Sequence, residues 1–152
     1  NASRMPRLLS VKAPGYAGSI DSGVEAAYLS LLPLLQEPEQ RLPASINILG
    51  VMNDDCYADN DLIELKKFLG SKVTVNCTLQ DCSLAEVATM QQAALNVCFG
   101  YGEALAKKMQ ERFGVPYIKC AYGKTCSASC SAVRKTFSPP FTTSSLYITL
   151  DA

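Results

Sequence analysis

Apolar residues follow two patterns along this chain, short strand-like runs and positions repeated at helical spacing. The strand-like runs, which are rich in apolar residues, are residues 46–51, 73–79, 95–99 and 117–120. Runs of this length between turn residues are typical of buried strands, and the periodic segments between them are typical of helices. Strands that alternate with helices form parallel sheets, so the pattern predicts an α/β fold with a mainly parallel sheet of four to five strands.

Three helix starts carry the pattern of a capping box, in which a serine or aspartate precedes a glutamate by three residues. The pairs are Ser22 with Glu25, Asp61 with Glu64, and Ser83 with Glu86. The first helix should end near Leu32, because Pro33 lacks an amide hydrogen and its ring crowds the preceding turn. Gly70 and Gly114 should end two later helices, since glycine tolerates the left-handed conformation.

The later helices each offer one apolar face to the sheet. The positions expected to be buried are Leu62, Leu65 and Leu69, then Leu84, Val87 and Ala88, and finally Leu105, Met109 and Phe113. Residues three and four apart lie on the same side of a helix, so each set forms a stripe that can pack on strands.

The two ends of the chain have less regular patterns. An apolar run at residues 7–12 predicts a strand that leads through a glycine-rich turn into the first helix. Residues 125–137 are compatible with a further helix, although several serines weaken its propensity. The alternation of apolar and polar residues at 146–150 predicts a half-buried strand at a sheet edge.

Length and composition indicate one soluble domain. The chain has 152 residues, of which 48% are apolar, enough to bury a single core. We expect residues 5–137 to form the domain, residues 1–4 to be the remnant of a purification tag, and residues 138–152 to form a tail. The 14 basic residues balance the 14 acidic ones, so neither nucleic acid nor an anionic membrane is an expected partner. No apolar run approaches the roughly 20 residues that a membrane span requires.

Histidine is absent and cysteine is frequent. Without histidine, the chain alone cannot supply a Ser-His-Asp or Cys-His catalytic group or a histidine-ligated zinc site. The seven cysteines are an odd number spread through an α/β pattern. Such usage favours reduced thiols, so we expect a cytoplasmic protein.

Ligands of parallel α/β sheets bind beyond the carboxyl ends of the strands. The candidate segments are therefore residues 53–55, 80–82, 100–102 and 121–123. Cys120, Cys126 and Cys130 cluster in sequence, but their spacing matches neither the common zinc patterns nor the ferredoxin runs. The acidic residues of 53–55 are compatible with cation binding or with a solvated loop.

Six segments occur in a characteristic order over about two thirds of the chain. They are residues 13–19 (Ala-Pro-Gly-Tyr-Ala-Gly-Ser), 46–50 (Ile-Asn-Ile-Leu-Gly), 61–68 (Asp-Leu-Ile-Glu-Leu-Lys-Lys-Phe), 83–86 (Ser-Leu-Ala-Glu), 95–97 (Leu-Asn-Val) and 111–117 (Glu-Arg-Phe-Gly-Val-Pro-Tyr). Together they resemble the nitrogenase component 1 family. That family includes both subunits of the molybdenum–iron protein, the scaffold proteins that assemble its cofactor, and related tetrapyrrole reductases.

The resemblance implies a Rossmann-like three-layer sandwich from the interior of a longer subunit. Members of the family pair with a homologous subunit and receive electrons from an ATP-dependent iron–sulfur reductase. They pass the electrons through an iron–sulfur cluster or related metallocluster. Most cysteines that hold the cluster between subunits lie upstream of the Pro-Gly-Tyr turn in the family, so the isolated fragment is expected to bind no cofactor and to be inactive.

The resemblance also suggests cofactor-binding positions. Cys98 matches a family cysteine that ligates the metal cofactor in one register, whereas a second register places that position nearer Gly100. The alternative for Cys98 is a small buried residue in a central strand. In the glycine-rich turn and the helix that follows it, Ser19, Asp21 and Glu25 are the matching candidates, and Asp21 and Glu25 replace a glutamine and a histidine of the family. Their alternative role is helix capping.

Three functions are compatible with these observations. The first is a nitrogenase-like oxidoreductase in which this domain forms part of a metallocluster or substrate cavity. The second is an assembly scaffold that holds a cofactor precursor without turning over a substrate. The third is an unrelated flavodoxin-like domain that binds a ligand, because a shared fold does not fix function.

Overall fold

The computed structural model describes residues 8–12, 18–52 and 58–120. These residues form one four-stranded parallel sheet, with the strand order β2-β1-β3-β4. The strands are β1 (Leu42–Leu49), β2 (Thr74–Thr78), β3 (Ala93–Phe99) and β4 (Tyr117–Cys120). The predicted α/β class, parallel sheet and three-layer arrangement are therefore confirmed.

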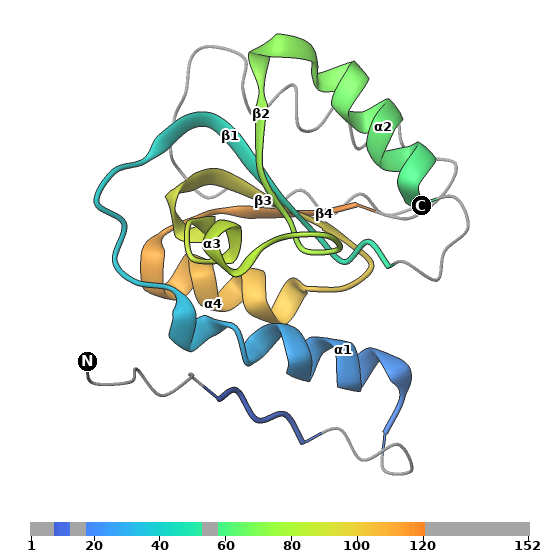
Figure 1. Cartoon of the computed structure of the whole chain (residues 1–152), viewed down its shortest axis with the longest axis vertical. Coiled ribbons are helices and arrows are strands. Elements are labelled where there is room, and N and C mark those ends of the chain that lie inside the picture. Colours follow the sequence, from blue (N-terminus) through green and yellow to red (C-terminus); the bar gives the residue numbers. More distant parts are fainter. Residues whose placement is uncertain (1–7, 13–17, 53–57, 121–152) are drawn as a thin grey trace, which may run out of the picture.

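Helices cover both faces of the sheet (Figure 1). They are α1 (Ile20–Leu29), α2 (Ala58–Leu69), α3 (Leu84–Val87) and α4 (Glu103–Phe113), with short 3-10 turns at η1 (Leu32–Leu34), η2 (Gly70–Lys72) and η3 (Met90–Gln92). Helix α2 lies on one face, whereas α3 and α4 lie on the other, and α1 packs along α4 on the side away from the sheet. No helix among the described residues has the length and apolarity that a membrane crossing needs.

Two apolar cores fill the spaces between the sheet and its helices. The core under α2 includes Ile46, Ile48, Leu65, Leu69 and Val97, with Leu62 packed against it. The core under α4 includes Leu49, Cys98, Leu105, Met109 and Phe113. The predicted buried faces of α2 and α4 are therefore confirmed.

Several predicted boundaries are wrong. Among residues 8–12 there is no strand, so the predicted strand at 7–12 is not formed there. Strand β1 begins four residues earlier than expected, at Leu42, because Arg41 anchors this part of the chain by donating to the backbone oxygens of Gln91 and Phe113. The predicted helix at 125–137 and strand at 146–150 lie outside the described residues.

Only one of the three predicted capping boxes forms. In α3 the Ser83 hydroxyl accepts from the amide of Glu86, and the Glu86 carboxylate accepts from the amide of Ser83. Helix α1 instead begins at Ile20 with Ser19 as its N-cap, and α2 begins at Ala58, ahead of Asp61. A three-residue spacing recurs within helices as well as at their starts, so the pattern alone does not fix the first turn.

Helix α3 is only one turn long, and this explains a wrong burial prediction. Val87 is buried as expected, but Leu84 is 72% exposed and Ala88 is also exposed. A single turn has no second residue on the face that meets the sheet, so it buries one apolar side chain rather than a stripe.

A row of three asparagines crosses the sheet beneath α3 and α4, with Asn47 and Asn96 buried and Asn76 half-buried. The Asn47 side-chain nitrogen on β1 donates to Asn96 Oδ1 on β3 at 2.7 Å and to the backbone oxygen of Met90 at 2.8 Å. Asn47 Oδ1 accepts from Asn76 Nδ2 on β2 at 2.9 Å. Because unpaired amides inside a protein cost free energy, this row fixes the lateral register of three strands. No local sequence pattern predicts this row.

A β-bulge directs Asn76 toward this row. Ile46 pairs with Val75 and Asn47 pairs with Cys77, so Asn76 is the extra residue of β2. Val75 packs against the core under α2, whereas Cys77, two residues later, lies in the core under α4. Residues two apart in a regular strand share a face, so the bulge is what places Cys77 on the opposite side.

Candidate functional site

The carboxyl ends of β1 and β3 are the expected place for a ligand. The chain leaves β1 toward β2 at one edge of the sheet and leaves β3 toward β4 at the other, so the connections diverge between these two central strands. This is the topological switch point, where α/β sheets commonly form a crevice. Glu25, Gly50, Cys98 and residues 100–102 surround this position, and we refer to them as the switch-point residues.

The loops after β1 and β3 approach one another closely at glycines. Gly50 has a φ of +83°, and a Cβ there would overlap the backbone oxygens of Phe99 and Tyr101. Gly102 has a φ of +86°, and its Cβ would lie 2.8 Å from Leu49 Cβ and 3.2 Å from the Tyr28 ring. Only glycine fits both the backbone conformation and the space. Backbone atoms of the loops after β1 and β3 therefore fill the space at the switch point.

Glu25 links α1 to the amino terminus of α4. Its Oε1 accepts from the amide of Gly102 at 2.6 Å, and its Oε2 accepts from the amide of Ala104 at 3.1 Å. Gly102 is the N-cap of α4 and offers no side chain for capping. A carboxylate on these amides satisfies the free donors and the positive end of the helix dipole. Glu25 is thus a helix cap, but of a different helix from the one that the sequence pattern indicated.

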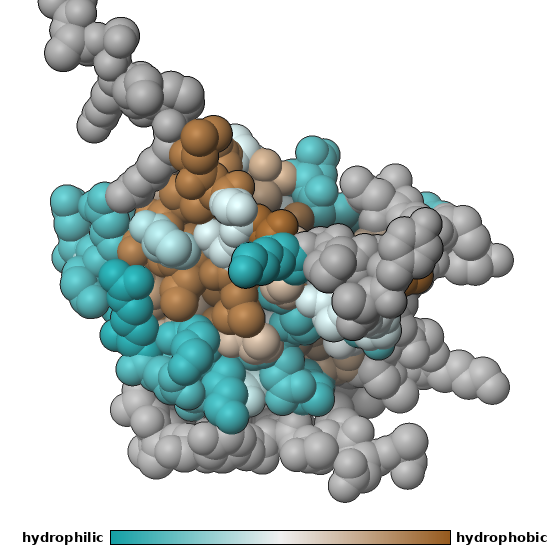
Figure 2. Space-filling view, turned by 90° about the horizontal axis from the view of Figure 1, so that it is seen from below, coloured by the Kyte–Doolittle hydropathy of each residue, from teal (hydrophilic) through white to brown (hydrophobic). Residues whose placement is uncertain are grey.

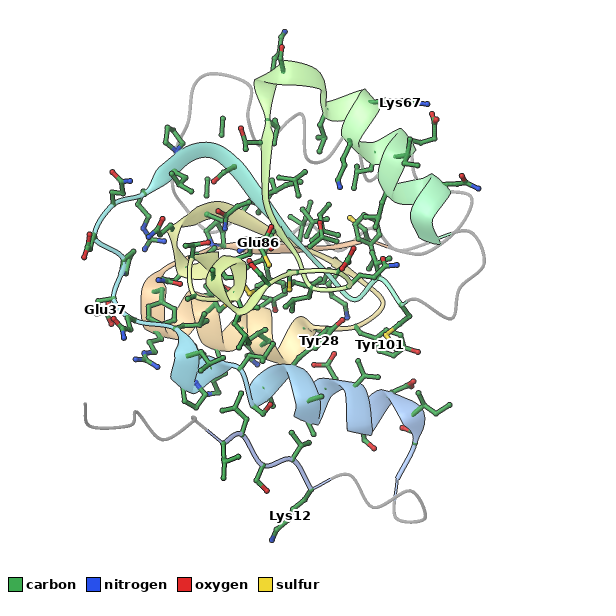
Figure 3. The ribbon with its side chains drawn as sticks, in the orientation of Figure 1. Lys12, Tyr28, Glu37, Lys67, Glu86 and Tyr101 are labelled. Atoms are coloured by element: carbon green, nitrogen blue, oxygen red, sulfur yellow. The ribbon has the colours of Figure 1, made fainter. Side chains whose placement is uncertain are left out.

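The capping carboxylate occupies the position where a phosphate or other anion would bind in many α/β proteins. The ring of Tyr28, one turn further along α1, lies beside Gly102, and Figure 3 shows Tyr28 between α1 and the sheet. Helix α1 therefore covers the switch point with its own side chains.

Cys98 lies near the end of β3, between Leu49 of β1 and Lys119 of β4 in the sheet register. Its side chain is 2% exposed and belongs to the core under α4. Burial raises the pKa of the Cys98 thiol strongly, with smaller contributions from Cys120 and from the carboxylates of Glu103 and Glu25. The sulfur is therefore a protonated thiol at neutral pH, and it becomes a thiolate only where a strong positive charge such as a metal replaces the proton.

The other predicted cofactor-binding residues lie at the periphery of this site. Gly100 is exposed directly after β3, with a φ of +79°. Ser19 is the N-cap of α1, and its hydroxyl accepts from the amide of Ser22 at 3.3 Å. Asp21 is exposed in the first turn of the same helix. The structure thus brings Glu25 close to Cys98 and Gly102, whereas Ser19 and Asp21 serve the start of α1.

A cavity lined in part by Gln80 and Asp81 of the predicted segment 80–82 lies along the edge of β2. It has a volume of about 1040 Å³ and is bounded by α2 on one side and by the β2–α3 turn and α3 on the other. Its polar lining includes Lys66, Asn76, Gln80, Asp81 and Glu86. Of the other predicted segments, residues 53–55 and 121–123 and the cysteines Cys126 and Cys130 lie outside the described residues.

Comparison with known proteins decides the family. The model of the "Nitrogenase component 1 type Oxidoreductase" family matches residues 1–146. The chain belongs to this family. The resemblance inferred from the sequence is therefore confirmed, and the alternative of an unrelated flavodoxin-like domain is wrong.

Two kinds of family member are similar to the chain. The nitrogenase iron-molybdenum cofactor biosynthesis protein NifE of Clostridium pasteurianum is 35% identical over 122 residues, which cover 76% of this chain and 26% of that protein. The nitrogenase molybdenum-iron protein alpha chain of Methanothermobacter marburgensis is 31% identical over 144 residues, covering 88% of this chain and 30% of that protein. The chain thus spans less than a third of the length of these relatives.

A solved structure shows the same fold. The structure titled "Nitrogenase Cp1 at pH 5" superposes with a TM-score of 0.54 and 20% sequence identity, covering 81% of this chain and 29% of that one.

Family membership implies a metallocluster, so the described residues were compared with what a cluster requires. Across residues 8–12, 18–52 and 58–120, no group of three or more cysteine, aspartate or glutamate side chains is placed to hold a metal ion. An iron–sulfur cluster is generally held by several thiolates. At the switch point the described residues offer the single thiol of Cys98, so they do not form a cluster cage by themselves.

Proposed function

We propose that this chain is a domain of a nitrogenase component 1-type oxidoreductase subunit and forms part of the wall of a metallocluster or substrate cavity. The observation that carries the proposal is the family match over residues 1–146. In the proposed complex the domain pairs with a homologous subunit, and an ATP-dependent iron–sulfur reductase supplies the electrons. The proposed location is the cytoplasm.

The switch-point residues support a role as a wall. Glu25 ties α1 to α4 through two amides, and Gly50 and Gly102 allow the loops after β1 and β3 to pack without a gap. Such an arrangement gives a firm surface at the carboxyl end of the sheet. A rigid surface suits a domain that supports a cofactor held mainly by other parts of a longer protein.

An apolar face supports the proposal that further protein packs on this domain. Figure 2 shows apolar side chains gathered on the side of the molecule where α1 and residues 8–12 lie. Leu8 is 90% exposed and Ile20 is 76% exposed, and Leu9 and Val11 are exposed as well. Contiguous exposed apolar residues usually mark surfaces that other protein covers.

Cys98 is the residue of this domain that we propose as a metal ligand. It has a soft sulfur donor at the carboxyl end of a central strand, which is the donor type that iron–sulfur clusters use. Cys77 is a matched control, because it is also a buried strand thiol with a pKa raised by burial. In the complete natural protein, Cys98→Ser should lower bound iron while Cys77→Ser should not. Equal iron in both variants would remove Cys98 from the ligand set.

A second function, cofactor assembly without substrate turnover, is favoured by one observation. The similar proteins from Clostridium pasteurianum and Bradyrhizobium diazoefficiens are both named as cofactor biosynthesis proteins. A scaffold and a reductase share the same fold and the same need for a cavity wall. They differ in whether bound metal is transferred to another protein or stays while a substrate is reduced.

The decisive experiment is purification of the complete natural protein without oxygen, followed by measurement of iron and acid-labile sulfide. Stoichiometric iron and sulfide, with substrate reduction that depends on ATP and the reductase, are expected for the oxidoreductase. Iron and sulfide without turnover, together with transfer of the cofactor to an acceptor protein that lacks it, would favour the scaffold. A folded protein without iron would contradict both functions.

A further inference from the structure

Two cysteines flank the turn between β2 and α3. Cys77 is the penultimate residue of β2, and Cys82 directly precedes Ser83, the N-cap of α3. The four residues between them form a turn that the amide of Asp81 closes by donating to the Thr78 oxygen at 3.2 Å. A turn of this kind brings its two ends close together, so the residues that flank it are also near one another.

The two thiols are in contact. The side chains of Cys77 and Cys82 are hydrogen-bonded to one another. Both side chains pack in the core under α4, where Cys77 is buried and Cys82 is half-buried. The bulge at Asn76 is responsible for this contact, because it places Cys77 on the α4 side of the sheet, the side on which Cys82 packs.

We propose that Cys77 and Cys82 form a redox site that closes reversibly to an intramolecular disulfide, with a low-molecular-weight disulfide as the oxidant. The Cys82 thiolate attacks one sulfur of the small disulfide, forming a mixed disulfide and releasing one small thiol. Cys77 loses its proton and attacks the Cys82 sulfur, which forms the Cys77–Cys82 bond and releases the second small thiol. Two protein thiols are oxidised, and one small disulfide is reduced to two thiols.

The environment of the pair assigns the order of attack. Cys82 is the more accessible sulfur. Burial raises the pKa of the Cys82 thiol, and the hydrogen bond with Cys77 offsets part of that rise. Burial and the neighbouring Cys82 raise the pKa of Cys77, which also lies deeper. Cys82 therefore attacks first and Cys77 resolves the mixed disulfide, since reaction requires both access and thiolate character.

The proposed bond has a structural consequence at the cavity beside β2. Cys77, Gln80 and Asp81 line that cavity, and all three belong to the segment that the disulfide would close. A bond across the turn removes freedom from this segment in the oxidised state. The redox state of the pair thereby sets the rigidity of one wall of the cavity.

The test equilibrates the 152-residue chain with defined ratios of oxidised and reduced glutathione, then quenches with acid and alkylates the remaining thiols. Cleavage after Lys72 and Lys107 yields one peptide with Cys77, Cys82 and Cys98, and fragmentation locates a bond between the first two. We expect the equilibrium constant for the Cys77–Cys82 disulfide to be at least about tenfold larger in the folded chain than in urea, because the fold holds the thiols together.

Two variants serve as controls, with far-ultraviolet circular dichroism to verify folding. Cys82→Ser should abolish the closed form, and Cys98→Ser should leave it unchanged. An equal equilibrium constant in folded and unfolded chains would overturn the proposal. So would a mixed disulfide on Cys82 that persists without closing, or a bond that joins Cys98 to either partner.

Discussion

Replacing Glu25 by alanine should destabilise the domain, because this carboxylate is the cap of α4. The substitution removes hydrogen bonds of 2.6 and 3.1 Å to the amides of Gly102 and Ala104, which have no other cap from their own helix. Hydrogen bonds to charged groups contribute about 1.5–3 kcal/mol each, and the half-buried position of Glu25 favours the low end of that range. Two such bonds give a loss of about 3 kcal/mol.

A loss of this size can be measured by urea unfolding. With a urea dependence of about 2 kcal/mol per molar, a loss of about 3 kcal/mol lowers the unfolding midpoint by about 1.5 M. Glu25→Gln keeps one acceptor oxygen but turns an amide group toward a backbone donor, so it should lose about half as much. Glu37→Ala is a suitable control, since Glu37 is exposed and lies at the edge of the molecule in the chain before β1 (Figure 3).

The control should change the free energy of unfolding by no more than about 0.5 kcal/mol. Equal midpoints for Glu25→Ala and Glu37→Ala would refute the assignment of Glu25 as the cap of α4. A changed slope with urea would instead show that the substitution alters how much surface unfolding exposes.

Three further predictions concern the sheet, its loops and α3. Asn47→Ala should cost about 3 kcal/mol in urea unfolding, because it removes the donor to the buried Asn96 Oδ1 and to the Met90 oxygen and leaves Asn76 Nδ2 with the Thr89 oxygen alone; a loss below about 0.5 kcal/mol, the size expected for an exposed substitution, would contradict a structural role for the asparagine row. Gly50→Ala should destabilise by at least about 2 kcal/mol more than Gly70→Ala, since both have positive φ but only Gly50 meets backbone atoms; equal melting temperatures for the two variants would count against the tight loop packing. The pKa of Glu86 is held below its usual range by the backbone amide of Ser83 and, to a smaller extent, by the Ser83 hydroxyl. The ionised Glu86 carboxylate therefore stabilises the fold at pH values above its unfolded pKa, and this stabilisation is lost as the pH falls through its folded pKa. Ser83→Ala should raise the Glu86 pKa part of the way, as carbon-detected NMR titration would measure, and an unchanged pKa would contradict the capping box.

Local sequence patterns determined much of the fold. The two central strands of this parallel sheet are buried along most of their length and coincide with runs rich in apolar residues, whereas the edge strands β2 and β4 keep exposed residues such as Thr74 and Lys119. The range of β4 matches its prediction. Helix ends at Gly70 and Gly114 were also predictable, because a positive φ is a property of the residue itself. The order of short segments was sufficient to identify the family.

Boundaries and helix starts were less predictable. The capping pattern was correct for Ser83 but not for Ser22 or Asp61, because Ser19 caps α1 and α2 extends further toward the amino terminus. Several residues near a helix start can accept the free amides, and the one that does depends on how the chain approaches the helix.

The sequence alone determined the α/β class, the four strands of the sheet and the helix stops at Gly70 and Gly114, since each follows from residues close together in the chain. It also determined the family, through the order of six short segments. Only the tertiary structure decided the partners of Glu25, which lie 77 and 79 residues away, and the asparagine row, whose members are up to 49 residues apart. It also decided that a bulge turns Cys77 toward Cys82. Hydrogen bonds and thiol contacts require atoms within a few ångströms, and folding alone brings such distant residues together.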